Sequence, residues 1–201
     1  TVEAVPAYLP VTLDSGMDLV IKDGTTLATD HDMNLIAGGN ITQQDGSAVQ
    51  VNVDGALSLE TKNGGVAKVH GVGSLTVDTI TADGGQLELT SDSGLTIDTI
   101  DAGLTGTVNL STPGAVSISG LVKSASLDVA ASGEVSLKTQ VDQLNINNTG
   151  ASGAISITQN RAGGDLEIGS IQQAVGNTDT ISLSTSSGSI VLPDTGTFVA
   201  N

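Results

Sequence analysis

A pair of apolar residues separated by one other residue returns about every ten positions along this chain, and this pattern constrains the fold more than any other feature. Alternate side chains of a β-strand point to opposite faces, so each pair predicts a short strand with two inward side chains. Gly, Ser, Asp, Asn and Thr between the pairs predict turns. The pairs form two alternating families, one opening at Leu75, Leu95, Val116, Val135 and Ile155, the other at Leu87, Val108, Leu127, Leu144 and Leu166.

Each family repeats with a nearly constant period, and the first returns after 20, 21, 19 and 20 residues. A period near 20 residues, built from strands and turns, predicts a parallel β-solenoid in which each coil stacks on the one before. A third, shorter set of apolar residues has the same period and predicts a roughly triangular cross-section. Its members are Ile80, Ile100, Leu121, Val141 and Ala162.

The composition agrees with a single all-β solenoid domain over residues 1–201. Aromatic residues make up only 1% of the chain, whereas a globular core of this size normally uses more of them. A narrow solenoid interior needs only stacked Leu, Val and Ile, and the 26 glycines fit many tight turns. We expect no helix, because no 3.6-residue periodicity is sustained, and no membrane insertion, because no apolar run approaches roughly 18 residues.

The charge of the chain excludes several classes of partner. The formal net charge is −16, from 22 acidic and 6 basic residues. Such a surface repels phosphate backbones and anionic lipids, so we expect neither a nucleic acid nor a membrane as partner. Cysteine is absent, which excludes a disulfide scaffold and a thiolate metal site.

We expect four segments along the solenoid: residues 1–16 as an N-terminal cap or docking segment, 17–74 as irregular coils, 75–168 as regular coils, and 169–201 as a loop with C-terminal coils or a cap. A solenoid must cover its open ends, since a terminal coil exposes unpaired backbone groups. Prolines and the two aromatic residues gather at the ends of this chain. The candidate residues for capping or for docking onto a neighbour are Pro6, Tyr8, Pro10 and Phe198.

The residue between the two apolar members of each pair is expected to point outward and to form columns along the rod. The first family predicts a hydroxyl column of Thr76, Thr96, Ser117, Ser136 and Ser156. The second predicts a column that mixes carboxylates with amides, formed by Glu88, Asn109, Asp128, Asn145 and Glu167. Carboxylates stacked without a break would repel each other, and asparagines between them relieve this repulsion.

Two functional alternatives apply to the second column: a flat contact surface for a partner, or a cation site. Carboxylates suit Ca²⁺, so the weak candidates for metal ligands are Glu88, Asp128 and Glu167. No other cofactor is expected.

The candidate catalytic residues are better explained as turn or surface residues. His31 lies between two aspartates without a second histidine nearby in sequence, and His70 is expected to be a solitary surface or cap residue. Polysaccharide-degrading enzymes often use parallel β-helices with clustered carboxylates, for which the candidates are Asp78, Asp98 and Asp101, with Asp83 and Asp92 near them. Tryptophan is absent and long loops are scarce, so we expect no enzyme and keep this class as a second alternative.

The segments Gly84–Ser91 (GGQLELTS) and Ser186–Leu192 (SSGSIVL) resemble the coils of large bacterial surface exoproteins. The likeness is one of period and composition over roughly residues 11–192, and the family is the filamentous-haemagglutinin-like, β-strand-repeat group. The resemblance implies a right-handed parallel β-helix that is exported to the bacterial cell surface or secreted. It also implies a role as an adhesin or as a component of a biofilm matrix.

Two functions from different classes follow. The first is an adhesin-like rod or stalk segment that contacts a host or abiotic surface. The alternative is a self-assembling subunit of an extracellular fibre, sheath or layer, whose partners are other copies of itself or adjoining solenoid blocks. The unusual residues at the two ends motivate this alternative.

Overall fold

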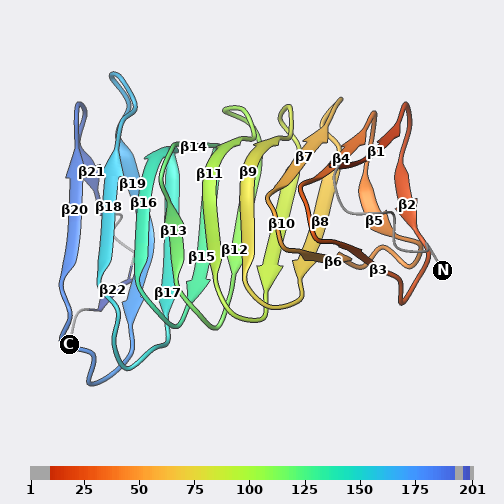
Figure 1. Ribbon diagram of the computed structural model, residues 1–201. Coiled ribbons are helices and arrows are strands. Elements are labelled where there is room, and N and C mark those ends of the chain that lie inside the picture. Colours follow the sequence, from red (N-terminus) through yellow and green to blue (C-terminus); the bar gives the residue numbers. More distant parts are fainter. Residues whose placement is uncertain (1–9, 193–196, 200–201) are drawn as a thin grey trace.

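The computed structural model describes residues 10–192 and 197–199, and in this part of the chain it is a parallel β-solenoid of about 9 turns with about 21 residues per turn. The coils stack into a rod with the first rung at one end and the last at the other (Figure 1). The described residues contain strands and turns but no helix, which confirms the all-β prediction. No helix among them could cross a membrane.

The first sheet forms one side of the rod and has nine successive rungs, all paired in parallel. Its short strand β14 (Val122–Lys123) pairs with both β11 and β16. The rungs in order are β1 (Val11–Ser15), β4 (Met33–Ala37), β7 (Leu57–Thr61), β9 (Leu75–Thr81), β11 (Leu95–Asp101), β13 (Val116–Ile118), β16 (Val135–Gln140), β18 (Ile155–Gln159) and β20 (Ile181–Thr185).

The second sheet faces the first across the core and is also parallel. Its main path is β2 (Leu19–Ile21), β5 (Ile41–Gln43), β8 (Val66–Gly71), β10 (Gln86–Ser91), β12 (Thr107–Ser111), β15 (Ser126–Ala131), β17 (Gln143–Asn148), β19 (Leu166–Gln173) and β21 (Ile190–Val191). Two further strands, β3 (Thr26–Thr29) and β6 (Val49–Val53), continue it beside β8, and β22 (Thr197–Val199) pairs with β19.

The core consists of apolar columns in which each inward side chain packs on its counterparts one rung before and one rung after. In the first sheet the register aligns Leu75, Leu95, Val116, Val135 and Ile155, each at most 1% exposed. The predicted strand family therefore matches the observed rungs. Full burial of such a side chain stabilises the fold by roughly 1.5–3 kcal/mol relative to exposure.

The third inward row is present, but its predicted members are wrong beyond Ile100. Strands β9 and β11 bend after their second inward residue, and the register then aligns Ile80, Ile100, Val122, Thr139 and Gln159. Leu121 is only half-buried, Val141 is buried away from this row, and Ala162 is exposed. The last two members of the row are polar. They satisfy each other in the core, because Thr139 Oγ1 donates to Gln159 Oε1 over 2.7 Å.

A β-bulge shifts the register between β17 and β19. Leu144 pairs with Ile168 but Asn145 pairs with Ser170, so Gly169 is the extra residue. A Cβ atom on Gly169 would lie 2.3 Å from Asn145 Oδ1, which explains why glycine occupies this position. The predicted alignment of Leu166 with Leu144 is wrong: Leu144 pairs with Ile168, two residues further along, and the bulge then adds one more residue.

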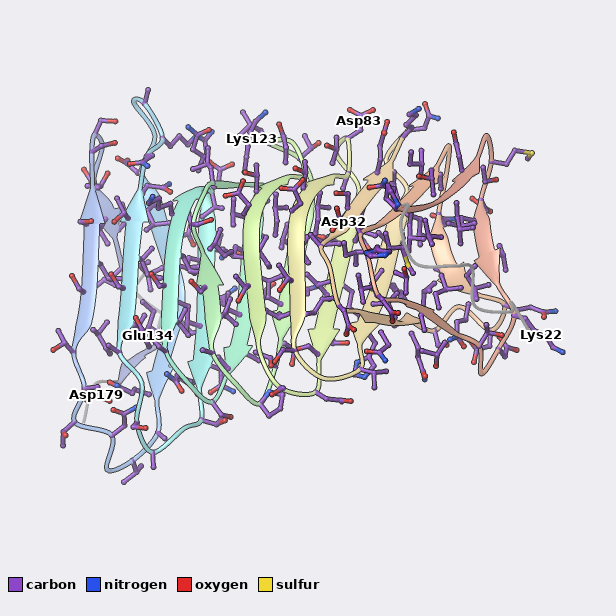
Figure 2. The ribbon with its side chains drawn as sticks, viewed as in Figure 1. Lys22, Asp32, Asp83, Lys123, Glu134 and Asp179 are labelled. Atoms are coloured by element: carbon purple, nitrogen blue, oxygen red, sulfur yellow. The ribbon has the colours of Figure 1, made fainter. Side chains whose placement is uncertain are left out.

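Side-chain acceptors link the turns of successive coils where the strand ladder ends. Asp18 Oδ1 accepts from the Asn40 backbone N–H over 2.7 Å, and Asp32 Oδ1 accepts from the Ala56 N–H over 2.9 Å. Figure 2 shows Asp83, at a turn, and Lys123, at the end of β14, along one edge of the rod, and Asp179, in a connecting segment, along the opposite edge. Many acidic residues thus serve the turns, where they satisfy backbone donors.

Candidate functional site

The outward hydroxyl column of the first sheet is confirmed by the strand register. Its members pair directly from rung to rung, and Ser182 of β20 extends the column by one further position. The full column is Thr76, Thr96, Ser117, Ser136, Ser156 and Ser182. This face of the rod is therefore flat and uncharged along the column, with hydroxyls repeated at the strand spacing of about 4.8 Å.

The outward column of the second sheet differs from the prediction at its end. The bulge at Gly169 places Ser170 opposite Asn145, while Glu167 pairs with Gln143. At its other end the column begins with Lys68, which pairs with Glu88. The observed column is Lys68, Glu88, Asn109, Asp128, Asn145 and Ser170.

The three candidate calcium ligands do not come together. Asn109 separates Glu88 from Asp128, so these carboxylates lie two rungs apart, or about 9–10 Å. A Ca²⁺ ion binds its oxygen ligands at about 2.3–2.6 Å and cannot bridge that gap. Glu167 lies outside the column altogether. Within the described ranges, no group of three or more His, Cys, Asp or Glu residues is placed to hold a metal ion.

A shallow groove of about 300 Å³ crosses the outward face of the second sheet. On its floor, Asn145 Nδ2 donates to Asp128 Oδ1 over 2.7 Å, and Ser170 Oγ donates to Asn145 Oδ1 over 3.4 Å. The amides of Asn109 and Asn147, which also line the groove, make no hydrogen bond to any described residue and are available to a partner. The polar lining consists of Asn109, Ser111, Asp128, Asn145, Asn147 and Ser170.

The end rungs differ from the interior rungs in how well their core residues are covered. Inward apolar residues of the first coil, such as Leu13 and Leu19, are half-buried, as are Ile181 and Leu183 of the last. Among the described residues, β1 and β20 each pair on one side only. Within the described residues, the end rungs therefore carry partly exposed apolar side chains and a strand edge without a partner.

Two of the four candidates for capping or docking lie among the described residues, and two lie outside them. Pro6 and Tyr8 lie outside the described residues. Pro10 is exposed and lies directly before β1. Strand β1 pairs with β4, so the first rung of the solenoid begins within the segment 1–16 that was predicted as a cap or docking segment. Phe198 lies in β22, where it pairs with Ile171 in the last rung of the second sheet. Capping and docking remain predictions for these residues.

The aspartates proposed for an acidic patch have local partners. Asp98 Oδ1 accepts from Ser119 Oγ over 2.7 Å, and Asp101 forms an ion pair with Lys123 over 3.2 Å. Asp101 also accepts from the Gly103 backbone N–H, which fixes the turn. Asp78 is exposed on β9, with no hydrogen bond to any described residue. Their interpretation as turn residues is wrong, because Asp78 lies in β9 and Asp98 and Asp101 lie in β11, where only Asp101, the last residue, borders a turn.

The two histidines behave differently. His31 lies at a turn, where its backbone N–H donates to Thr29 Oγ1 over 3.1 Å. The prediction that His70 is solitary is wrong: its Nδ1 atom lies 2.8 Å from Thr90 Oγ1 and its Nε2 atom lies 3.2 Å from Asp92 Oδ1. A sequence signal existed, because His70 and Thr90 are 20 residues apart, which is one coil.

Comparisons with known proteins add no relative: no family model, curated protein or solved structure matches the chain.

Proposed function

We propose that this chain is a structural rod of the adhesin-like kind, exposed on a bacterial cell surface or secreted, which attaches cells or matrix to a host or abiotic surface. The observation that supports this proposal most directly is the continuous parallel pairing of nine successive rungs in the first sheet, from β1 to β20. Rungs hydrogen-bonded on both sides form a stiff spacer. At about 4.8 Å per rung, the described coils span on the order of 40 Å.

The outward face of the second sheet supplies a suitable contact surface. Repetition places similar polar groups at regular intervals, so a partner with repeated groups can engage several of them at once, and weak contacts add up to useful avidity. The groove on the second sheet offers the unpaired amides of Asn109 and Asn147 for such contacts. The net charge of −16 keeps the rod soluble and opposes lateral association of its sheets.

The test is attachment of bacteria that display the chain, compared with bacteria that carry the display anchor alone, on glass, polystyrene and epithelial monolayers under flow. We expect displaying cells to attach more, and the double variant Asn109→Ala/Asn147→Ala to attach less. The matched control is Thr76→Ala/Thr96→Ala on the opposite face. Equal attachment of displaying and anchor-only cells on all three surfaces would overturn the adhesin proposal.

The half-buried end rungs support a second candidate, a subunit that polymerises end to end. Ile181 and Leu183 of β20 have the same spacing as Val11 and Leu13 of β1, so a second copy could continue the inward columns. Light scattering and negative-stain images test this candidate. Fibres that are lost in Leu183→Asp would support it, and a monomeric wild-type rod at high concentration would exclude it.

A further inference from the structure

We propose that Thr90, His70 and Asp92 act together as nucleophile, base and orienting acid, and that Thr90 accepts acyl groups from carboxylic esters. His70 Nδ1 lies 2.8 Å from Thr90 Oγ1, and His70 Nε2 lies 3.2 Å from Asp92 Oδ1. A hydroxyl within hydrogen-bond reach of an imidazole that a carboxylate holds on its other side is the arrangement that activates a nucleophile. This activity is independent of the rod function.

The strand ladder holds these three side chains on a rigid support. His70 on β8 and Thr90 on β10 are direct partners in the register, so their side chains stand side by side on the outward face. Asp92 follows β10 directly, and its backbone N–H donates to Gly71 O over 3.1 Å. Sites built on paired strands keep their geometry better than sites on loops.

The hydrogen bonds also define where the proton lies on a neutral His70. An ionised Asp92 only accepts hydrogen bonds, so His70 Nε2 must carry the proton that faces it. His70 Nδ1 then has a free lone pair that accepts from Thr90 Oγ1 over 2.8 Å. The Val69 carbonyl oxygen is a second acceptor for the same hydroxyl, but it lies at 3.5 Å, so the imidazole offers the shorter hydrogen bond. The nearest cation along β8, Lys68, is directed elsewhere, because its Nζ atom donates to Gly46 O over 3.2 Å. The tautomer is therefore the one that general-base catalysis requires.

The site is open to a substrate from solvent. The side chain of His70 is 29% exposed and that of Asp92 is 58% exposed, while Thr90 is half-buried between its neighbours. Ser111 on β12 pairs with Thr90 on the side away from His70, is exposed, and makes no side-chain hydrogen bond to any described residue. Its hydroxyl is therefore free to donate to an oxyanion that forms beside Thr90.

The reaction balances without any cofactor. Thr90 Oγ1 bonds to the ester carbonyl carbon while its proton passes to His70 Nδ1, and the carbonyl oxygen becomes an oxyanion that Ser111 stabilises. The bond to the leaving alcohol then breaks, and the alcohol takes the proton from His70. Water, deprotonated by His70, next attacks the acyl group on Thr90, which releases the carboxylic acid and restores the hydroxyl.

The probe is p-nitrophenyl acetate with the purified chain, read out as nitrophenolate release and as acetylated peptides by mass spectrometry. We expect mass spectrometry to find an acetyl group on Thr90. The rate of nitrophenolate release above background should fall about tenfold or more in Thr90→Val and in His70→Gln, since general-base catalysis contributes about 10²-fold or more. The rate of nitrophenolate release by Asp92→Asn should lie between the rates of these variants and that of wild type. The matched control, Thr96→Val in the hydroxyl column of the first sheet, should leave the rate unchanged.

Three results would overturn the proposal. The first is an unchanged rate of release in Thr90→Val, which would make His70 itself the reacting group. The others are acetyl groups found only on lysines, and equal acetylation of Thr90 in wild type and in His70→Gln. Thr90→Ser keeps the hydroxyl and should retain activity, so a loss in Thr90→Val can be separated from a folding defect. Circular dichroism of each variant checks that the rod is intact. Failure here leaves the attachment test unaffected.

Discussion

Asn145 Nδ2 donates a hydrogen bond to Asp128 Oδ1 over 2.7 Å, and the two residues are direct partners on the adjacent rungs β17 and β15. In the same column, Asn109 stands between Asp128 and Glu88. Asn109 therefore separates two carboxylates that would otherwise stack at about 5 Å, and Asn145 gives Asp128 a charge-assisted hydrogen bond on its other side.

This relationship predicts that Asn145→Asp destabilises the rod by about 0.5–1 kcal/mol, because it places two carboxylates opposite each other. The loss should shrink as salt is added, since exposed charges are screened. Asn145→Ala is the control: it removes the hydrogen bond but adds no charge, so its loss should not depend on salt. Urea unfolding at low and high salt measures both, and equal salt dependence would contradict the prediction.

Glycines at the close contacts between coils predict a second effect. A Cβ atom at Gly114 would lie 1.5 Å from the Ser93 carbonyl oxygen, whereas one at Gly94 would lie 3.5 Å from the nearest atom, an ordinary contact. Gly114→Ala should therefore cost about 1–3 kcal/mol or more, because backbone must move, and Gly94→Ala should cost much less. Thermal unfolding of the two variants checks this, and similar midpoints would refute the close stacking of these turns.

The core columns predict that position along the rod controls the cost of a cavity. Leu95 is 1% exposed between Leu75 and Val116, so Leu95→Ala should cost about 2–5 kcal/mol. Leu13, in the first rung, is half-buried, and Leu13→Ala should cost less. Urea unfolding curves of the two variants give the comparison, and an equal loss would show that the first rung is as well covered as the interior.

The turn at residues 43–47 predicts a local response to acid. The side-chain hydroxyl of Ser47, and then its backbone N–H, hold the pKa of Asp45 below its ordinary value of 3.8. A carboxylate with a lowered pKa stabilises the folded state above the unfolded pKa, and this contribution is lost as the pH falls through the folded pKa. Ser47→Ala should raise the pKa of Asp45. Side-chain NMR titration measures it, with Asp45 unchanged in Ser58→Ala as the control.

The sequence predicted the coils, the first-sheet column and the solenoid itself, because inward apolar residues and outward polar residues both repeat with the coil. It misplaced Glu167 because Leu166 was aligned with Leu144, which is two residues out of register, so Glu167 still points outward but pairs with Gln143. It misplaced the third row because a one-residue shift turns a side chain to the other face. The bulge at Gly169 and the bend before Ile80 are such shifts, and they depend on contacts between coils. The contact of His70 with Thr90 was missed because, among outward positions, the period was applied only to the residue between the two apolar members of each pair.

The aligned columns also have a consequence for how a protein of this kind can change over generations. Leu95 and Val116 occupy equivalent places one coil apart, and Val116 could rest on Leu75 as Leu95 does. Removal of residues 95–115 would therefore rejoin matching surfaces, while removal of a few residues would turn inward side chains outward. Inherited variation in length should accordingly proceed by whole coils, each altering reach by about 4.8 Å and leaving the remaining contacts as they were.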